Sequence, residues 1–138
     1  MDGGVIFLLA AIIIVGAMLF AFISFGKHGR KLNVDKYRMR WLAIEQSLIK
    51  GSESSYHMAI LNADKLVDRA LKDSGFGGKT MGDRLKLSKN RYSNRDSIWT
   101  AHKLRNQIAH ESDVKVSFDQ ARHALAGFKR ALKDLGAI

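Results

Sequence analysis

The sequence contains no cysteine and no proline, and no lysine or arginine precedes Lys27. Without cysteine the chain can form neither a disulfide framework nor a thiolate metal site. Without proline it lacks the residue that interrupts helices most strongly. No segment alternates polar and apolar residues with the period of two that is typical of strands. The sequence therefore predicts an all-α protein.

Cofactor and metal motifs are also missing. The five histidines are scattered along the chain and do not have the spacing of a zinc motif. The stretch SGFGGKT, residues 74–80, ends like a phosphate-binding loop, but Asp73 stands where that motif needs its first glycine. We therefore expect no metal, no nucleotide loop and no redox cofactor.

An uncharged run, residues 5–25, dominates the N-terminal part of the chain. As a helix it is roughly 31 Å long, which matches a bilayer core of about 30 Å. A backbone in lipid must satisfy its own hydrogen bonds, so we expect a transmembrane helix here, after a short external tail of residues 1–4. A cleavable signal peptide is the alternative. It fits less well because Asp2, not a basic residue, precedes the run and no small-x-small site follows it.

Basic residues determine the expected orientation of this helix. All 23 lysines and arginines follow Gly26, and Lys27, Arg30 and Lys31 lie in a basic linker, residues 26–33. Cytoplasmic flanks carry this bias, so we expect a single-pass protein of the cell (inner) membrane with its N-terminus outside and its C-terminal domain in the cytoplasm. The same three residues are candidate contacts for anionic lipid headgroups, or they serve only to set the topology.

Residues 34–138 are expected to form a cytoplasmic helical bundle. Apolar residues recur there at helical spacing, and the predicted helices cover about residues 34–50, 54–72, 81–89, 95–111 and 118–135. The expected caps are Thr80, either Ser93 or Asn94, and Ser117 with Gln120 in a capping box. A four- to five-helix bundle is the fold that buries these apolar stripes against one another. Beyond Gly26 the net charge is +11, which attracts RNA, anionic membrane or acidic protein without choosing among them.

The stretch LRNQIAHE, residues 104–111, belongs to the fourth of these helices. On a helical wheel the bundle-facing arc contains Ile98, Ala101, Leu104 and Ile108, and the solvent-facing arc contains Lys103, Gln107 and Glu111. Between the two arcs lies a strip that neither packing nor solvation explains. It consists of Trp99, His102, Asn106 and His110, with Arg105 at its border.

The residue types in this strip suit chemistry on a phosphodiester. Arg105 offers a planar, charged fork that matches phosphate, and a histidine such as His110 can transfer a proton. Asn106 is four residues before His110 and can orient its imidazole. Together they can cleave RNA without a metal if histidine activates the 2′-hydroxyl or protonates the leaving oxygen while arginine stabilises the phosphorane. Trp99 and His102 are candidate binding residues beside them.

Helix geometry limits how Arg105 and His110 can act together. They are separated by roughly 140° around the helix and by about 7.5 Å along it. One helix can hardly direct both side chains to one phosphate, whereas two copies of the helix across a two-fold axis can. The sequence therefore predicts a parallel homodimer with a composite site.

The hexapeptide RNQIAH, residues 105–110, resembles the Arg-x4-His motif of the HEPN superfamily, in which a polar residue directly follows the arginine. The resemblance covers the motif strictly and the helical order of residues 34–135 loosely. It implies a small all-α bundle, often a metal-independent RNase, whose paired motifs form one dimeric site. It also implies that Arg105 contacts phosphate, His110 transfers a proton and Asn106 supports them. The chain is similar as well to small bacterial proteins that join one N-terminal anchor to such a domain.

Two other interpretations of the motif stay open. The first is a non-catalytic site at which a membrane-tethered module binds protein, RNA or anionic lipid. The second is purely structural, with Arg105 and His110 holding their helix against its neighbours. The expected partners are accordingly the membrane, RNA, a second copy of the chain and a protein encoded by a neighbouring gene.

Overall fold

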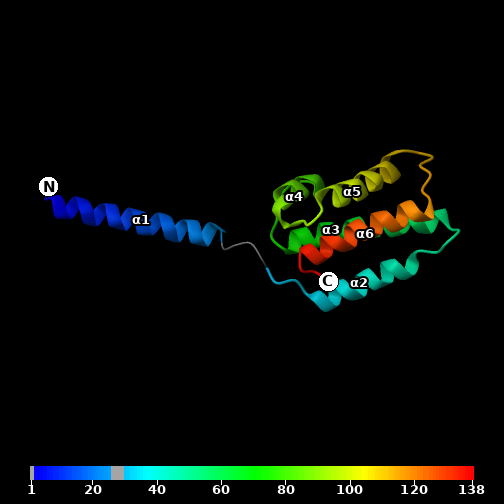
Figure 1. The fold of residues 1–138 in the computed structure, drawn as a ribbon, viewed down its shortest axis with the longest axis horizontal. Helices are drawn as coiled ribbons and strands as arrows, with labels where there is room; N and C mark the ends of the chain where they lie inside the picture. Colours follow the sequence, from blue (N-terminus) through cyan, green and yellow to red (C-terminus); the bar gives the residue numbers. More distant parts are fainter. Residues whose placement is uncertain (1, 26–29) are drawn as a thin grey trace. The chain divides into compact units, whose positions relative to one another are not determined.

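The computed structural model describes residues 2–25 and 30–138, without the side chains of residues 24 and 25. Every regular element within these residues is helical, which confirms the all-α prediction for this part of the chain (Figure 1). The chain divides into two compact units, Met1–Arg30 and Lys31–Ile138. Lys27, one of the predicted lipid contacts, lies outside the described residues.

The first unit contains one helix, α1 (Gly3–Phe25). The segment Gly3–Ile23 is long and apolar enough to cross a membrane, and none of its most apolar window is buried. Its large apolar side chains are exposed within this unit, with Phe7 and Phe22 about four-fifths exposed. The helix carries no acidic or basic residue in its first or last turn.

The second unit contains the remaining helices in the order that the sequence predicts. They are α2 (Val34–Ser47), α3 (Glu53–Asp73), α4 (Met81–Leu87), the 3-10 turn η1 (Lys89–Arg91), α5 (Arg95–His110) and α6 (Phe118–Asp134). Thr80, Asn94 and Ser117 cap α4, α5 and α6 by accepting a hydrogen bond from the backbone N–H three residues on. The capping box of Ser117 with Gln120 is confirmed.

Helix α2 is shorter than predicted. Its last residue is Ser47, about one turn before the expected end, and Leu48 is already extended. The turn that follows is held by α3, because the Ser55 hydroxyl bonds to both backbone groups of Ile49 and the Tyr56 hydroxyl accepts the Gly51 N–H. These side chains lie in the next helix, so periodicity within residues 34–50 does not reveal the earlier stop.

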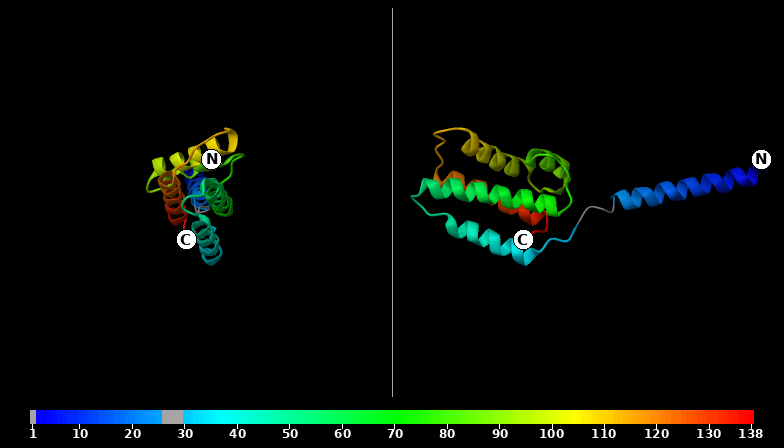
Figure 2. Two further views of the ribbon diagram at one scale, coloured as in Figure 1. Left: turned by 90° about the vertical axis from the view of Figure 1, so that its right-hand side faces the viewer. Right: turned by 180° about the vertical axis from the view of Figure 1, so that it is seen from behind.

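Helices α3 and α6 lie side by side in the centre of this unit, with α5 on one side and α2 on the other (Figure 1 and Figure 2). The core forms where their apolar stripes meet, and Ile60, Leu71 and Phe128 are fully buried in it. Leu32, in the predicted linker, also packs into this core. Helix α2 is tied down at its start, where the Tyr37 hydroxyl donates to Asp73 at 2.6 Å.

Candidate functional site

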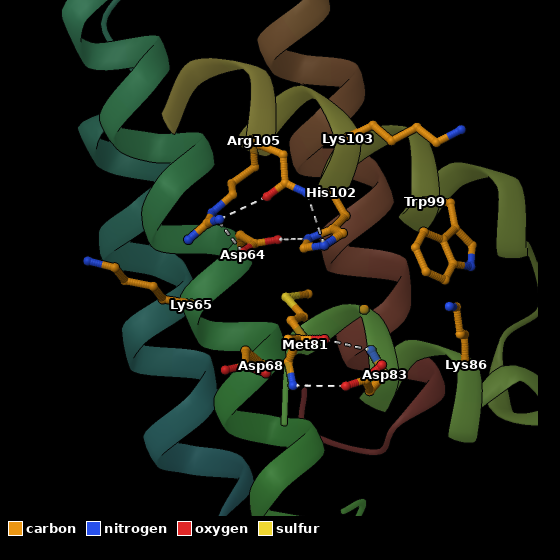
Figure 3. Close-up of a pocket in the computed structure, with 13 residues that line it drawn as sticks. Asp64, Lys65, Asp68, Met81, Asp83, Lys86, Trp99, His102, Lys103 and Arg105 are labelled. Atoms are coloured by element: carbon orange, nitrogen blue, oxygen red, sulfur yellow. Dashed lines mark hydrogen bonds and ion pairs between the residues drawn. The ribbon is translucent and has the colours of Figure 1, made fainter. Parts of the chain in front are cut away.

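A pocket of about 550 Å³ opens between α3, α4 and α5, within the size range of ligand sites (Figure 3). Helix α3 contributes Asp64, Lys65 and Asp68. The start of α4 contributes residues 80–83, and its last turn contributes Lys86. Helix α5 contributes Trp99, His102, Lys103, Arg105 and Asn106. Four of the five residues in or bordering the predicted strip therefore line one cavity. The remaining one, His110, is the last residue of α5, is exposed, and does not line this pocket.

Four of the lining residues form a closed ring of polar contacts, which we call the Asp64 ring: Asp64, His102, Asn106 and Arg105. Asp64 Oδ1 lies 2.8 Å from His102 Nδ1, and Asp64 Oδ2 lies 3.1 Å from Arg105 Nε. The Arg105 Nη1 donates to Asn106 Oδ1 at 2.9 Å. Asn106 Nδ2 closes the ring at 3.4 Å from His102 Nε2. Figure 3 shows Arg105 and His102 on either side of Asp64, with dashed lines joining them to it.

The ring explains how Asp64 can be buried. Asp64 as a residue is 3% exposed and lies on the same apolar face of α3 as Ile60 and Val67. A buried carboxylate needs compensation, which Arg105 supplies as a counter-charge and His102 as a hydrogen bond. The Arg105 Nε contact is an ion pair whose angle falls short of a hydrogen bond. Arg105 therefore holds α5 to α3 as well as facing the pocket.

Asp64 is not among the site residues that the sequence predicts. The available signal was an acidic residue that interrupts an apolar helical stripe, between Ile60 and Val67. Such a residue requires a partner, but the partners lie in α5, far along the chain. Nothing in the local sequence of α3 names them.

The charged side chains around the pocket that form no ion pair within the described residues are positive. Lys65, Lys86 and Lys103 are exposed, and none of them forms an ion pair within the described part of the chain. The two other acidic residues are already occupied: Asp68 pairs with Arg84 and Lys72, and Asp83 closes the capping box of α4. Anionic groups are therefore attracted to this cavity.

Trp99 supplies the pocket with a partly exposed aromatic surface. Its ring centroid lies 6.0 Å from that of His102 in an edge-on arrangement, and its side chain is half-buried. The indole can therefore pack against an apolar or aromatic part of a ligand while the lysines contact its charge.

Of the predicted lipid contacts, Arg30 and Lys31 are exposed.

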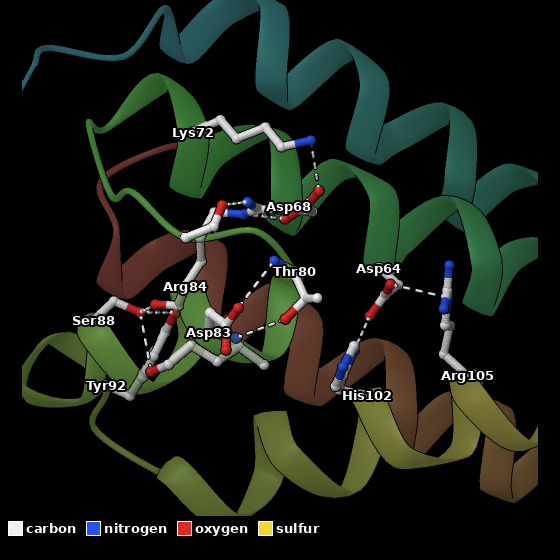
Figure 4. A network of polar contacts seen from close by, with 12 residues as sticks. Asp64, Asp68, Lys72, Thr80, Asp83, Arg84, Ser88, Tyr92, His102 and Arg105 are labelled. Atoms are coloured by element: carbon white, nitrogen blue, oxygen red, sulfur yellow. Dashed lines mark hydrogen bonds and ion pairs between the residues drawn. The ribbon is translucent and has the colours of Figure 1, made fainter.

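A second polar network fixes the floor of the pocket to α3 (Figure 4). Arg84, buried in α4, donates from Nε to Asp68 at 2.7 Å and from Nη1 to the Gly78 carbonyl at 2.6 Å. Burial by itself raises the pKa of Asp68, but hydrogen bonds from Arg84 and Lys72 outweigh it and hold this pKa below its usual value. Beside this network, burial raises the pKa of Tyr92 to about 12.

Acid is expected to release this network. The pKa of Asp68 is lower in the folded chain than in the unfolded chain, so its contribution to stability is complete above its ordinary value of about 4 and is lost as pH falls below it. Asp68→Asn is expected to cost about 1.5–3 kcal/mol at pH 7 and less at pH 3, where the carboxyl of the unfolded chain has already taken up its proton. Thermal unfolding of the full-length chain in detergent, followed by circular dichroism, measures the difference.

The matched control for this prediction is Asp113→Asn, because Asp113 is exposed and takes part in no ion pair within the described residues. The control should follow the wild-type pH curve. An Asp68→Asn variant that stays equally destabilised at pH 3 and pH 7 would show that the ion pair with Arg84 does not stabilise the fold.

The chain matches no protein-family model, no curated protein and no solved structure. No group of three or more histidine, aspartate or glutamate side chains in the described residues is placed to hold a metal ion. The side chains of the pocket supply an imidazole with a carboxylate behind it, a guanidinium, an amide, an indole, and three lysines that form no ion pair with the described residues.

Proposed function

We propose that the chain is a membrane-anchored, HEPN-like protein that binds single-stranded RNA at the α3–α4–α5 pocket and cuts it without a metal, as a dimer. The observation that carries the proposal is the convergence of Arg105 and Asn106, the first two residues of the Arg-x4-His motif, on a pocket with a positive rim. Arg105 and Asn106 thus line a cavity, whereas His110 of the same motif is exposed outside it.

The proposed anchor is α1, which the basic residues after it orient. Its exposed apolar side chains need a lipid environment, because none of its most apolar window is buried. Lys27, Arg30 and Lys31 follow it and favour the cytoplasmic side, where anionic headgroups also attract them. In this topology the second unit faces the compartment that contains RNA.

Single-stranded RNA suits the pocket better than a duplex or a compact anion. Lys65, Lys86 and Lys103 can follow a phosphate backbone, and Trp99 can stack on an unpaired base. Arg105 uses Nε and Nη1 within the Asp64 ring, and its Nη2 forms no hydrogen bond in the described residues. That remaining edge of the guanidinium can contact a phosphate oxygen.

Cleavage requires His110 from a second copy. His110 does not line the pocket that contains Arg105, so within one protomer the two motif residues do not act on the same phosphate. Two α5 helices around a two-fold axis can place His110 of one copy at the pocket of the other, where it protonates the leaving 5′-oxygen.

A non-catalytic binding module is the second candidate function. The observation that favours it is the pairing of Arg105 with buried Asp64, which neutralises much of the arginine and gives it a structural role. In this case the pocket binds RNA or an acidic protein and leaves it intact.

The test is an assay of the full-length chain in lipid nanodiscs with single-stranded RNA and EDTA. We expect cleavage that leaves 2′,3′-cyclic phosphate ends, because the attacking group is the substrate's own 2′-hydroxyl. DNA of the same sequence lacks this hydroxyl and should bind without being cut.

The Arg105→Lys variant keeps the positive charge but loses the planar guanidinium that matches phosphate, so it should cut RNA more slowly than the wild type. Binding of RNA without any cleavage, in a preparation shown to be dimeric, would contradict the RNase proposal and leave the binding module. Cleavage that EDTA abolishes would contradict the metal-independent mechanism.

A further inference from the structure

We infer that His102, oriented by Asp64, is the general base of this pocket and takes the proton from the substrate hydroxyl. The inference rests on the proposed function and adds to it a residue that the Arg-x4-His motif does not contain. Its starting point is the Asp64 ring, whose hydrogen bonds can run in only one direction.

Arg105 sets that direction because a guanidinium can only donate. Its Nη1 donates to Asn106, so the atom at 2.9 Å must be the amide oxygen and the amide nitrogen must face His102. An amide nitrogen donates, so His102 Nε2 must accept and therefore carries no proton. The proton of the neutral imidazole is then on Nδ1, which donates to Asp64 at 2.8 Å.

The Nε2 lone pair is consequently available to a ligand. Its only hydrogen bond within the described residues is the 3.4 Å contact with Asn106, which is long for a nitrogen donor. His102 lines the pocket although only 7% of the residue is exposed. A ribose hydroxyl in the pocket can replace this weak partner with a shorter bond. Asp64 stabilises the imidazolium that forms when the proton is taken.

The proposed reaction needs such a base in addition to His110. Metal-free cleavage requires one group to take the proton of the 2′-hydroxyl and another to give a proton to the leaving oxygen. One imidazole cannot do both at the same moment. With His110 acting from the second copy as the acid, His102 is the imidazole left inside the pocket to act as the base.

The step balances as a transesterification. The 2′-oxygen forms a bond to phosphorus as His102 Nε2 takes its proton, and the bond from phosphorus to the 5′-oxygen breaks. The electron pair of that bond stays on the 5′-oxygen, which takes a proton from His110 of the second copy. The products are a 2′,3′-cyclic phosphate and a free 5′-hydroxyl. His102 then releases its proton to water, and His110 regains one from water.

The test variant is His102→Asn in the full-length chain in nanodiscs. The asparagine amide can still donate to Asp64 in place of Nδ1, so the ring keeps its anchor while the basic nitrogen is removed. We expect the cleavage rate to fall by about 10²-fold or more, whereas RNA affinity should stay within about twofold of wild type. A purely structural role for His102 would weaken binding and cleavage together.

The matched control is His123→Asn. His123 on α6 is exposed, lies outside this pocket, and has the same kind of Nδ1 contact, 2.8 Å from the Asp119 carbonyl. This variant should bind and cut RNA like the wild type.

A spectroscopic readout tests the tautomer without any cleavage. In the full-length chain with ¹⁵N-labelled histidine, NMR should show His102 protonated on Nδ1 and not on Nε2. Asp64→Asn should shift the proton toward Nε2, because an amide can donate to Nδ1 where a carboxylate cannot. A wild-type His102 with its proton on Nε2 overturns the inference.

The outcomes separate the two proposals. If the wild type cuts RNA and folded His102→Asn cuts equally fast, this inference is overturned and the proposed function stands. If the wild type binds RNA but does not cut it, both are overturned. If His102→Asn does not fold, His102→Gln replaces it, and a wild-type rate in that variant counts against the inference in the same way.

Discussion

Asp64→Ala is expected to lower the free energy of unfolding of the helical domain by about 3–5 kcal/mol, because it leaves a partly buried charge without its partner. The Asp64 side chain is 4% exposed and that of Arg105 27%, so water only partly replaces the lost carboxylate. His102 Nδ1 also loses its only hydrogen bond in the described residues. Thermal or denaturant unfolding of the full-length chain, followed by circular dichroism, measures this loss.

The control for this prediction is Asp96→Ala on α5. Asp96 is exposed in the first turn of that helix, where its removal costs less than about 1 kcal/mol of dipole interaction. Asp64→Asn keeps a hydrogen-bonding group of the same shape and should be milder than Asp64→Ala. If Asp64→Ala unfolds at the wild-type temperature, α5 is not held to α3 through the Asp64 ring.

The largest expected effect on activity comes from His110→Ala, which should slow RNA cleavage by about 10²-fold or more. The His110 side chain is exposed and forms no hydrogen bond or ion pair within the described residues, so the fold does not depend on that side chain. The unfolding temperature should accordingly stay at the wild-type value. Cleavage assays and melting curves on the same preparation separate catalysis from stability.

Substitutions of His110 and of His102 should therefore differ in their effect on the unfolding temperature. Both variants are expected to lose cleavage, but only His102 is a member of the Asp64 ring, where its substitution removes the contact with Asn106. His110→Ala with wild-type activity would remove the acid from the mechanism and leave His110 as an exposed residue at the end of α5.

The sequence predicts the helices well because their signals are local. Thr80, Asn94 and Ser117 each begin a helix with a side chain that bonds to a backbone N–H only three residues away. The strip on α5 is predictable for the same reason, since the helical period alone places Trp99, His102 and Asn106 on one side. All three line the pocket.

The rest of the site depends on contacts between helices and is hidden from local patterns. Asp64 and His102 are 38 residues apart in sequence, and only the packing of α3 against α5 brings them together. The same packing pairs Arg105 with Asp64. The motif alone predicts an arginine that is free to bind phosphate. The pocket also needs residues from the start of α4, which the sequence marks only as a helix cap.

A mixing experiment tests the composite dimeric site most directly. Arg105→Lys and His110→Ala are each expected to be impaired as pure full-length proteins. When equal amounts are co-reconstituted and exchange subunits, about half of the dimers contain one copy of each variant, and each of these has one intact site of two. We predict that EDTA-resistant cleavage by the mixture rises to about a quarter of the wild-type rate. Cleavage no faster than the average of the two separate variants would contradict a site shared between two copies.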